Sequence, residues 1–376
     1  MDCLVKKEND MPLKEQIIAF LHTKAFQLLV VSFIILALIP IFVTDKFSIF
    51  LFTLILIFSI YASSWNFLAN SGQGSLGHAA FLGIGGFTSA IIGNKIAQAV
   101  AATTGGYTIP ISALSLAVQL CVIFIGGLIS AGIGLLIGLA CVRLKAWYLA
   151  MVTFGFSVIA FALSSQFDFI TNGNQGFRPQ TLVLNGFPFY LLVITFAVVS
   201  ITAMYLIMKS RMGLAFRAIK ENESEARMIG INTSRYKLTA FVISTFFAGI
   251  AGSLYVYFIS FVDNSIFSPT NSFLPLIMTV IGGLGTVSGP IIGAIFLTSV
   301  GQILNLQGVN QTLSATLGPL FPKVGYAGPP LTYLIIGVIL LVIVIFSPQG
   351  LTHQFRKLYT YIMTEEKKEP KKNEGN

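Results

Sequence analysis

Two glycine-rich stretches come closest to a known chemical motif in this 376-residue sequence. One extends from Gly72 to Gly86 and the other from Gly282 to Pro290. Glycine-rich loops can cradle phosphate groups, but a nucleotide-binding loop needs a Lys followed by Ser or Thr after its glycines. Neither stretch contains that pair. The chain is therefore not expected to bind ATP by this route.

Catalytic and metal-binding constellations are also missing from the sequence. It contains no nucleophile beside a base, no paired carboxylates and no histidines at metal-ligand spacing. The three cysteines, Cys3, Cys121 and Cys141, are scattered and suggest neither a disulfide framework nor a metal site. The sequence therefore predicts no enzyme activity, no cofactor and no metal.

The first glycine-rich stretch could line a transport pathway or form a hinge. Polar groups for a pathway would come from Gln73, Ser75 and His78, while Gly77 and Gly83 would give flexibility. The alternative is ordinary helix packing, because small residues let a neighbouring helix approach closely. We prefer the hinge for the stretch as a whole and a packed, locally bonded side chain for His78 alone. In the second stretch the corresponding candidates are Gly282, Gly283, Gly285 and Thr286.

A dense cluster of charge, which we call the charged island, lies between two apolar segments. The 29 residues from Lys209 to Lys237 carry ten charged side chains, whereas the 162 residues from Phe47 to Met208 carry five. A lipid bilayer excludes such a charge density from its core. The island must therefore lie in water at one face of a membrane.

The island is predicted to contain one helix, over residues 213–229. A mostly apolar stripe follows a helical spacing along it: Ala215, Ile219, Asn222, Ala226 and Ile229. A helix that lies on anionic lipid would have a bulky apolar stripe and an almost wholly basic polar face. Here the stripe is small and three glutamates interrupt the basic face. This pattern favours docking into a groove of another protein.

The ends and the polar face of this helix also carry recognisable signals. Glu223 and Arg227 stand four positions apart with the acid first, which is the favourable order for an ion pair on a helix. Gly230 is expected to end the helix in a left-handed conformation. Either Asn232 or Thr233 is expected to cap the helix that follows.

Composition places the chain in a membrane. Hydrophobic residues make up 55% of the sequence and charged residues 10%, and the mean hydropathy is +0.83. A soluble chain of this size would need far more charge to cover its surface. The net charge of +9 does not indicate nucleic-acid binding, because the basic residues border apolar segments and form no aromatic-interleaved groove.

Eight segments are apolar and long enough to cross a membrane, at about 20 residues each. They are 26–43, 46–69, 77–98, 113–142, 147–166, 187–208, 237–261 and 331–347. A ninth region, 273–304, is interrupted by glycines and is expected to enter and return, or to cross twice as two short helices. The predicted fold is an all-α polytopic membrane protein with eight full spans and one glycine-broken element.

The basic residues predict the orientation of these spans. If the N-terminus is cytoplasmic and the spans alternate, 19 of the 23 lysines and arginines lie on the cytoplasmic side. Both termini are then cytoplasmic, provided that the glycine-broken element returns to its side of entry. The chain divides into a cytoplasmic segment (1–25), a transmembrane domain (26–347) with a cytoplasmic loop at 209–236, and a charged cytoplasmic tail (348–376).

Several motifs resemble those of the permease subunits of bacterial branched-chain amino acid ABC transporters. They are Gln73-x-Ser75-Leu76-Gly77-His78-Ala79-Ala80-Phe81, Gly213-Leu214-Ala215-Phe216-Arg217-Ala218-Ile219-Lys220-Glu221-Asn222-Glu223, Gly282-Gly283-Leu284-Gly285-Thr286 and Ser347-Pro348-Gln349-Gly350-Leu351. Their order and spacing hold from about residue 60 to residue 351. The Pro-Gln-Gly ending resembles the M-type subunit of that system.

This resemblance implies a fold, a location and a set of partners. The fold would be that of a type II ABC permease, like the vitamin B12 importer, in a bacterial inner membrane. The partners would be a second permease subunit in a heterodimeric pore, two cytosolic ABC ATPase subunits and an extracytoplasmic solute-binding protein. The charged island would be the loop that couples to the ATPases. Its candidate coupling residues are Arg217, Lys220, Glu221, Glu223, Glu225, Arg227 and Gly230.

Other functions stay open on the sequence alone. Urea permeases resemble this scaffold too, so urea or another small polar solute is the main alternative to Leu, Ile and Val. A secondary transporter would need a membrane-buried ionisable residue or an unwound cation site, whereas Asp168 and Asp263 fall at the edges of spans. A membrane-embedded enzyme or scaffold is the last alternative, and the lack of a catalytic constellation argues against it.

Overall fold

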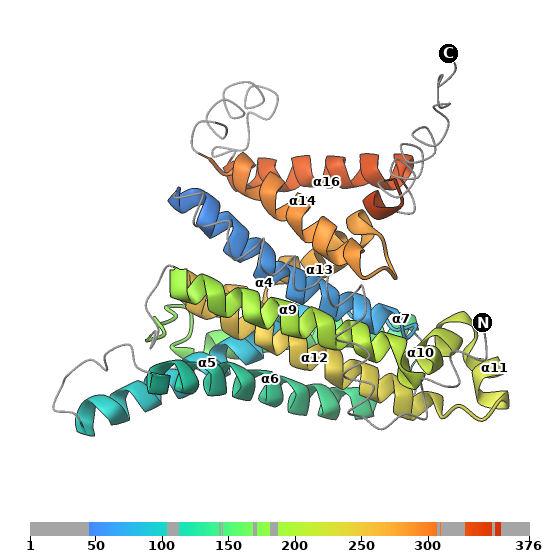
Figure 1. Ribbon diagram of the computed structural model, residues 1–376, viewed down its shortest axis with the longest axis horizontal. Helices are drawn as coiled ribbons and strands as arrows, with labels where there is room; N and C mark the ends of the chain where they lie inside the picture. The colour runs from blue at the N-terminus through green and yellow to red at the C-terminus, as the bar shows by residue number, and fades with distance from the viewer. Residues whose placement is uncertain are drawn as a thin grey trace, which may run out of the picture.

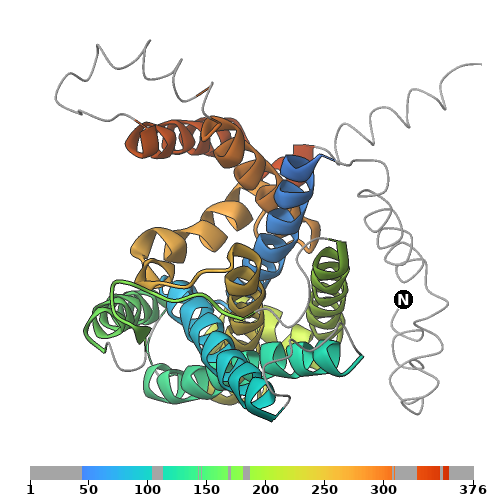
Figure 2. The same cartoon turned by 90° about the vertical axis from the view of Figure 1, so that its left-hand side faces the viewer.

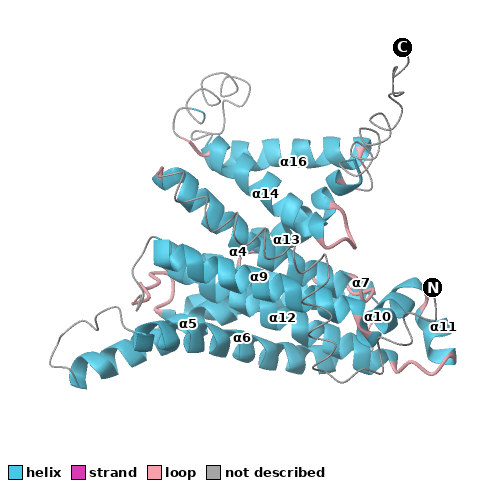
Figure 3. Cartoon of the chain, viewed as in Figure 1, coloured by secondary structure: helices cyan, strands magenta, loops and turns pink. Residues whose placement is uncertain are grey.

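The computed structural model describes residues 45–103, 113–142, 144, 146–167, 171–180, 187–306, 309, 328–347 and 350–354. These residues are almost entirely helical (Figures 1 and 3), and their extended pairing is limited to one isolated bridge between Phe177 and Val262. The helices are α4 (Lys46–Ala69), α5 (His78–Thr103), α6 (Ala113–Cys141), α7 (Ala146–Gln166), α9 (Phe187–Lys209), α10 (Arg211–Glu221), α11 (Glu223–Met228), α12 (Thr233–Ile259), α13 (Pro269–Gly282), α14 (Ser288–Leu304) and α16 (Gly328–Phe346), with a short 3₁₀ helix, η1, at Asn264–Phe267.

Six of the described helices are long and apolar enough to cross a membrane: α4, α5, α6, α7, α9 and α12. They coincide with six of the eight predicted spans, which confirms a polytopic helical membrane protein. The predicted span 26–43 lies outside the described residues. The last predicted span coincides with α16, which is not among these six helices. The count of eight spans therefore stays a prediction.

The core forms where α12 packs between α5, α6 and α4 (Figure 2). Small residues bring these helices close together, since a side chain on Gly252 would overlap the backbone carbonyl of Leu82. A buried Ser130 on α6 donates one hydroxyl toward both neighbours, at 3.0 Å from the carbonyl oxygen of Phe81 and 2.9 Å from that of Thr245. Close approach and shared hydrogen bonds are what holds helices together in lipid, where burial of apolar surface adds little.

Helix α4 connects this core to the remaining helices. Every residue of its second half, from Tyr61 to Ala69, is buried. One side of α4 packs on α12 and α9, and the other side packs on α13 and α14. The indole Nε1 of Trp65 donates to the carbonyl oxygen of Ser75 at 2.6 Å, which ties the glycine-rich stretch after α4 to the helix itself.

The predicted glycine-broken element consists of two short helices. Helices α13 and α14 are joined by residues 283–287, which we call the turn. The two helices lie against each other so tightly that a side chain on Gly293 would overlap the backbone carbonyl of Met278. The break thus falls at the predicted glycines. Whether the pair crosses the membrane or returns to its side of entry stays a prediction.

A second interruption, which the sequence analysis did not foresee, lies between α12 and α13. Residues 260–268 contain only η1, and the ring of Phe267 sits where a side chain on Gly83 would be. The Ser157 hydroxyl donates to the Phe267 carbonyl at 3.1 Å, and the Tyr61 hydroxyl donates to the Asn271 carbonyl at 3.0 Å. Because Ser157 and Gly83 belong to predicted spans, this irregular backbone lies alongside the interior of the helix bundle.

The prediction of one island helix over residues 213–229 is wrong. Asn222 has extended backbone angles (φ −155°, ψ 111°) and separates α10 from α11. Its side chain accepts hydrogen bonds from the first turn of α11, including one of 3.0 Å from the backbone nitrogen of Ser224. Asparagine competes in this way with the backbone of a continuous helix.

The predicted stripe is correspondingly broken. Ala215, Ile219 and Ala226 are buried, but Asn222 is exposed and the side chain of Ile229 is 74% exposed. The terminal signals are confirmed.

Gly230 has a left-handed backbone (φ 88°), and the side chain of Asn232 caps α12 by accepting from the backbone nitrogen of Arg235. These two residues set the direction in which the chain leaves α11 and enters α12.

We predict that Gly252→Ala destabilises the folded chain by about 1–3 kcal/mol, because the added methyl group meets rigid backbone. The matched control is Gly155→Ala on α7, where an added side chain meets no atom within 4 Å. That change should be neutral or stabilising by up to about 1 kcal/mol. Thermal unfolding of both variants in detergent measures the difference. Equal melting temperatures would contradict the packing described for α12.

Candidate functional site

The structure brings the two sets of sequence candidates together at one end of the bundle, which we call the charged end. It comprises residues 70–77, α10, α11 and the turn (Figure 1, where α10 and α11 lie at the right). A side chain on Gly72 would come within 3.2 Å of the Cα atom of Lys220, and one on Gly285 within 3.5 Å of the Lys220 Nζ atom. The backbone of the charged island therefore packs on the first glycine-rich stretch, and the side chain of Lys220 ends near the second.

Asn66, near the end of α4, holds the turn. Its side-chain oxygen accepts from the backbone nitrogen of Gly285 at 2.9 Å, and its side-chain nitrogen donates to the carbonyl of Thr286 at 2.8 Å. The Thr286 hydroxyl in turn accepts from the backbone nitrogen of Gly289 at 3.0 Å, at the start of α14. Sequence analysis missed Asn66. The available signal was an amide side chain close to the end of an otherwise apolar span.

The segment after α16 also contacts the turn. Gly350 has a left-handed backbone and packs against the backbone of Gly283. The hydroxyl of Thr352 donates to the carbonyl oxygen of Gly282. The Ser347–Leu351 motif thus places the beginning of the C-terminal tail on the end of α13, and the tail beyond residue 354 lies outside the described residues.

Glu223 fastens the charged island to α12. Its carboxylate forms the predicted ion pair with Arg227, at 2.8 Å, and a second ion pair with the buried amine of Lys237. The hydroxyl of Thr233 lies 3.2 Å from the same carboxylate. Partial burial raises the pKa of Glu223, but the hydrogen bond and charge of Lys237, with hydrogen bonds from Thr233 and Arg227, outweigh it and hold the pKa below its ordinary value.

The other candidate coupling residues lie on the outside of the island. Lys220, Glu221, Glu225 and Gly230 are exposed. Arg217 is exposed as well, and it donates to the carbonyl oxygen of Met208 at 2.9 Å, close to the end of α9. Another protein could contact these exposed residues without a steric clash. The role of these residues in coupling stays a prediction.

The candidates for a pathway or hinge in the first glycine-rich stretch are all buried: Gln73, Ser75, Gly77, His78 and Gly83. The Gln73 side chain donates to the Lys237 carbonyl at 2.9 Å. His78 Nε2 lies 3.0 Å from the Ser244 hydroxyl, and its Nδ1 has no hydrogen-bond partner among the described residues. A side chain on Gly77 would overlap the backbone of Thr153. These contacts account for the residues by helix packing, while a pathway role stays a prediction.

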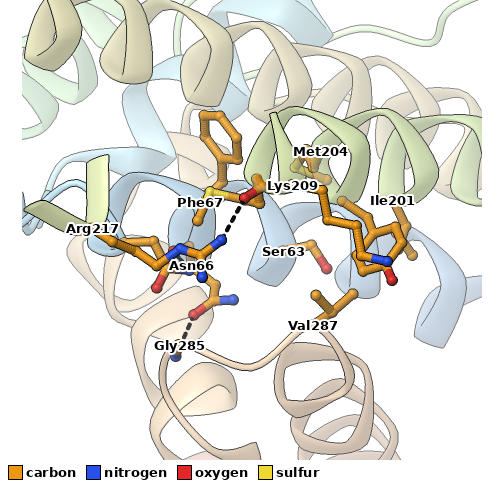
Figure 4. Close-up of a pocket in the computed structure, with 12 residues that line it drawn as sticks. Ser63, Asn66, Phe67, Ile201, Met204, Lys209, Arg217, Gly285 and Val287 are labelled. Carbon is orange, nitrogen blue, oxygen red and sulfur yellow. Dashed lines mark hydrogen bonds between the residues drawn. The ribbon is translucent and has the colours of Figure 1, made fainter. Parts of the chain in front are cut away.

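A cavity of about 290 Å³ opens at the charged end between α4, α9, α10 and the turn (Figure 4). Asn66 and Gly285 lie at its floor, and the side chains of Lys209 and Arg217 lie along its rim. Within the described residues, no group of three or more His, Cys, Asp or Glu side chains is placed to hold a metal ion.

Comparison with protein families matches residues 47–344 to one described as the permease component of a branched-chain amino acid transport system. The match covers more than half of the chain and nearly all of its described helices. The chain therefore belongs to the branched-chain amino acid transport permease family. The resemblance inferred from the sequence motifs is confirmed, and the chain is an ABC-transporter permease component of the multi-pass membrane type.

Individual relatives agree with this assignment. The chain is 28% identical over 303 residues to the high-affinity branched-chain amino acid transport system permease protein LivM of Escherichia coli, covering 72% of this chain and 67% of that protein. It is 26% identical over 201 residues to a probable ABC transporter permease protein of Sinorhizobium fredii, covering 49% and 59% of the two chains. It is also 30% identical over 116 residues to the autoinducer 2 import system permease protein LsrC of Salmonella typhi, covering 29% and 33%. No solved structure matches the chain.

We predict that Asn66→Ala loosens the turn, because two partly buried backbone groups lose a hydrogen bond worth about 0.5–1.5 kcal/mol each. Amide hydrogen exchange should accelerate at residues 283–287. Asn94→Ala is the matched control, since both amide atoms of Asn94 bond the backbone of Arg178 and Gln180 at the other end of α5. It should accelerate exchange at residues 178–180 and leave the turn protected. Unchanged exchange at the turn in Asn66→Ala would refute the clamp.

The lowered pKa of Glu223 predicts a pH dependence with a defined sign. A carboxylate whose pKa is lower in the folded chain stabilises it above the ordinary value of 4.5, and the contribution is lost as the pH falls through the lowered value. Wild-type stability should therefore fall in this acidic range. The Glu223→Gln variant should be less stable at neutral pH, and its stability should change less with pH in the same acidic range. The free energy of unfolding of both proteins, measured as a function of pH, tests this prediction.

Glu221→Gln is the control for this titration. Glu221 is exposed and forms neither of the two ion pairs found among the described residues. Its variant should keep the wild-type pH profile. The assignment fails if Glu221→Gln and Glu223→Gln flatten the profile equally.

Proposed function

We propose that this chain is one permease subunit of an ABC importer for branched-chain amino acids. Membership of the permease family and the similarity to LivM support the substrate class. In this proposal the chain forms a heterodimeric pore with a second permease subunit, in a bacterial inner membrane and with the type II permease fold. An extracytoplasmic solute-binding protein delivers the substrate. Two cytosolic ABC ATPase subunits supply the work, since this chain has no nucleotide-binding loop.

The charged end is the side that faces the ATPases in this proposal. The distribution of Lys and Arg places it in the cytoplasm, with the two termini on the same side. Eight spans and a returning α13–α14 pair satisfy this arrangement. The described part of the chain is compatible with it, because the first residue of α4 and the loop at 171–180 lie at the opposite end of the bundle from α10 and α11 (Figure 1).

The observation that carries the coupling proposal is an exposed apolar pair at the tip of the charged island. Met228 and Ile229 are 85% and 74% exposed, although both lie among charged neighbours rather than on a predicted span. Large apolar side chains on a polar surface mark sites where another protein binds. The island that carries them is fastened to α12 through the ion pair of Glu223 with Lys237, and the side chain of Lys220 ends near the turn. A partner that binds the tip would therefore pull on α12.

This anchoring assigns different roles to the residues of the island. Glu223 keeps the loop in place through its two ion pairs. The residues Lys220, Glu221, Glu225 and Arg227 are exposed on α10 and α11 and would supply the polar part of the interface. In protein interfaces an apolar anchor supplies most of the affinity, while the polar rim contributes orientation and association rate.

We predict that Met228→Ser and Ile229→Ser each weaken binding of the cognate ATPase subunits by about tenfold or more, the effect of losing one interface anchor. Transport and permease-stimulated ATP hydrolysis should fall in parallel. The control is Met151→Ser on α7, which removes an apolar side chain that is 70% exposed on a predicted span. Its ATPase binding should be unchanged. Equal binding by the tip variants and the wild type would exclude this docking surface.

The substrate class needs a separate test, because the relative LsrC carries a name that refers to autoinducer 2. We expect uptake by the reconstituted importer to be saturable for leucine and to be competed by isoleucine and valine. Urea should not compete. Uptake of urea, or competition by urea as strong as that by isoleucine, would favour the alternative of a small polar solute. Uptake without ATP would instead indicate a secondary transporter.

A further inference from the structure

The chemistry of the cavity at the charged end indicates a particular ligand. The cavity lies where α9 changes from an apolar helix to the charged island. Its lining consequently combines apolar side chains with two cations, Arg217 on one side and Lys209 on the other (Figure 4). A volume of about 290 Å³ is just below the usual range for small-molecule sites, about 300–1,000 Å³.

The cationic side of the cavity has no acidic partner. Lys209 and Arg217 both line the rim, and none of the lining residues is an Asp or a Glu. The ion pairs among the described residues both involve Glu223, so neither rim cation is neutralised there. Lys209 instead lies over the ring of Tyr205 at 4.7 Å, and Arg217 donates to a backbone carbonyl. The two cations approach the cavity from opposite sides (Figure 4), and cations without an acidic partner favour an anionic ligand.

The deeper wall offers one unused polar group among apolar ones. The hydroxyl of Ser63 lines the cavity, is buried, and has no hydrogen-bond partner among the described residues. A buried hydroxyl without a partner is uncommon and calls for a ligand or a water molecule. Around it lie the apolar side chains of Ile201, Met204 and Val287.

This combination excludes a free amino acid as the best ligand. A zwitterion carries an ammonium group, which would lie beside Lys209 and Arg217 without any carboxylate from the lining residues to balance it. A phosphodiester with an acyl chain has the matching chemistry. Its phosphate would lie at the cationic rim, and the first part of its chain would lie against Ile201 and Val287.

We propose that the cavity binds the phosphate head group of an anionic phospholipid. Basic pockets between membrane-spanning helices at the cytoplasmic face are suited to such head groups. The bound lipid would contact Arg217 on the island and Gly285 in the turn at the same time. It would thereby stabilise the contact between these two parts of the charged end.

The test uses the purified full chain in detergent and follows its thermal unfolding during three titrations. The probes are short-chain phosphatidylglycerol, phosphatidylcholine of the same chain length, and inorganic phosphate. Phosphatidylglycerol should raise the melting temperature in a saturable way, as a ligand of the folded state does. Phosphatidylcholine, which has no net charge, should give little shift. Inorganic phosphate, which has no chain, should need a much higher concentration.

Variants locate the site. Lys209→Gln should raise the half-saturation concentration of phosphatidylglycerol about tenfold, which is the effect expected for the loss of one charge-assisted hydrogen bond. Ser63→Ala should raise it as well. Lys46→Gln is the matched control, because it removes the same charge at the opposite end of α4. Its titration should equal that of the wild type.

Three outcomes would overturn the proposal. Equal stabilisation by phosphatidylcholine would show that the cavity does not select an anion. Inorganic phosphate acting at the same concentration as phosphatidylglycerol would show a site for free anions rather than for lipid. Wild-type titrations in Lys209→Gln and Ser63→Ala, or an equal loss in Lys46→Gln, would place the binding elsewhere.

Discussion

The structure depends on one constraint: every backbone polar group that is removed from water needs a hydrogen-bond partner. Regular helices meet this requirement internally, but this chain breaks its helices twice inside or beside the bundle. At residues 260–268 the hydroxyl of Ser157 supplies a donor to the Phe267 carbonyl, and just after this break the hydroxyl of Tyr61 donates to the Asn271 carbonyl, which Pro275 leaves without its helical donor. At the turn, the side chain of Asn66 supplies one donor and one acceptor. Both breaks are therefore held by neighbouring helices rather than by their own sequence.

Helix α4 serves both breaks, and this gives it a central position. Tyr61 and Asn66 lie about one and a half turns apart on the same helix. Through them α4 holds the beginning of α13 and the turn after it, while its other side packs on α9 and α12. The α13–α14 pair is thus attached to the main bundle by α4. A movement of the turn would require a movement of α4, of the island beside it, or the loss of these hydrogen bonds.

The sequence predicted the parts of this arrangement that depend on local chemistry. Apolar segments of sufficient length gave the spans, and the glycines at 282–285 gave the break between α13 and α14. Gly230 predicted the end of α11, and Asn232 predicted the start of α12. Each of these features depends on residues that are close in the sequence, so the pattern itself contains the information.

Features that depend on distant contacts were missed. Asn222 was assigned to an apolar stripe because its spacing fits a helix, whereas its side chain caps α11 and breaks that helix. The importance of Asn66 could not be inferred, because its partners lie 219 and 220 residues away. Within the glycine-rich stretch from Gly72 to Gly86, the sequence did not reveal the close approach of Gly77 to α7 and of Gly85 to α12, and a role as a hinge stays a prediction. Periodicity alone does not distinguish flexibility from close approach.

The central claim is that the charged island and the turn form one mechanical unit. It is tested most directly by joining them covalently in the assembled transporter. Cysteines at Lys220 and Val287, in a chain whose three native cysteines are replaced, would be linked by a short bifunctional thiol reagent. If the two parts move together, ATP-driven uptake persists after linking at close to the rate of the unlinked protein. Loss of uptake on linking, with recovery when the link is cleaved, would show that they must move apart and would contradict the account.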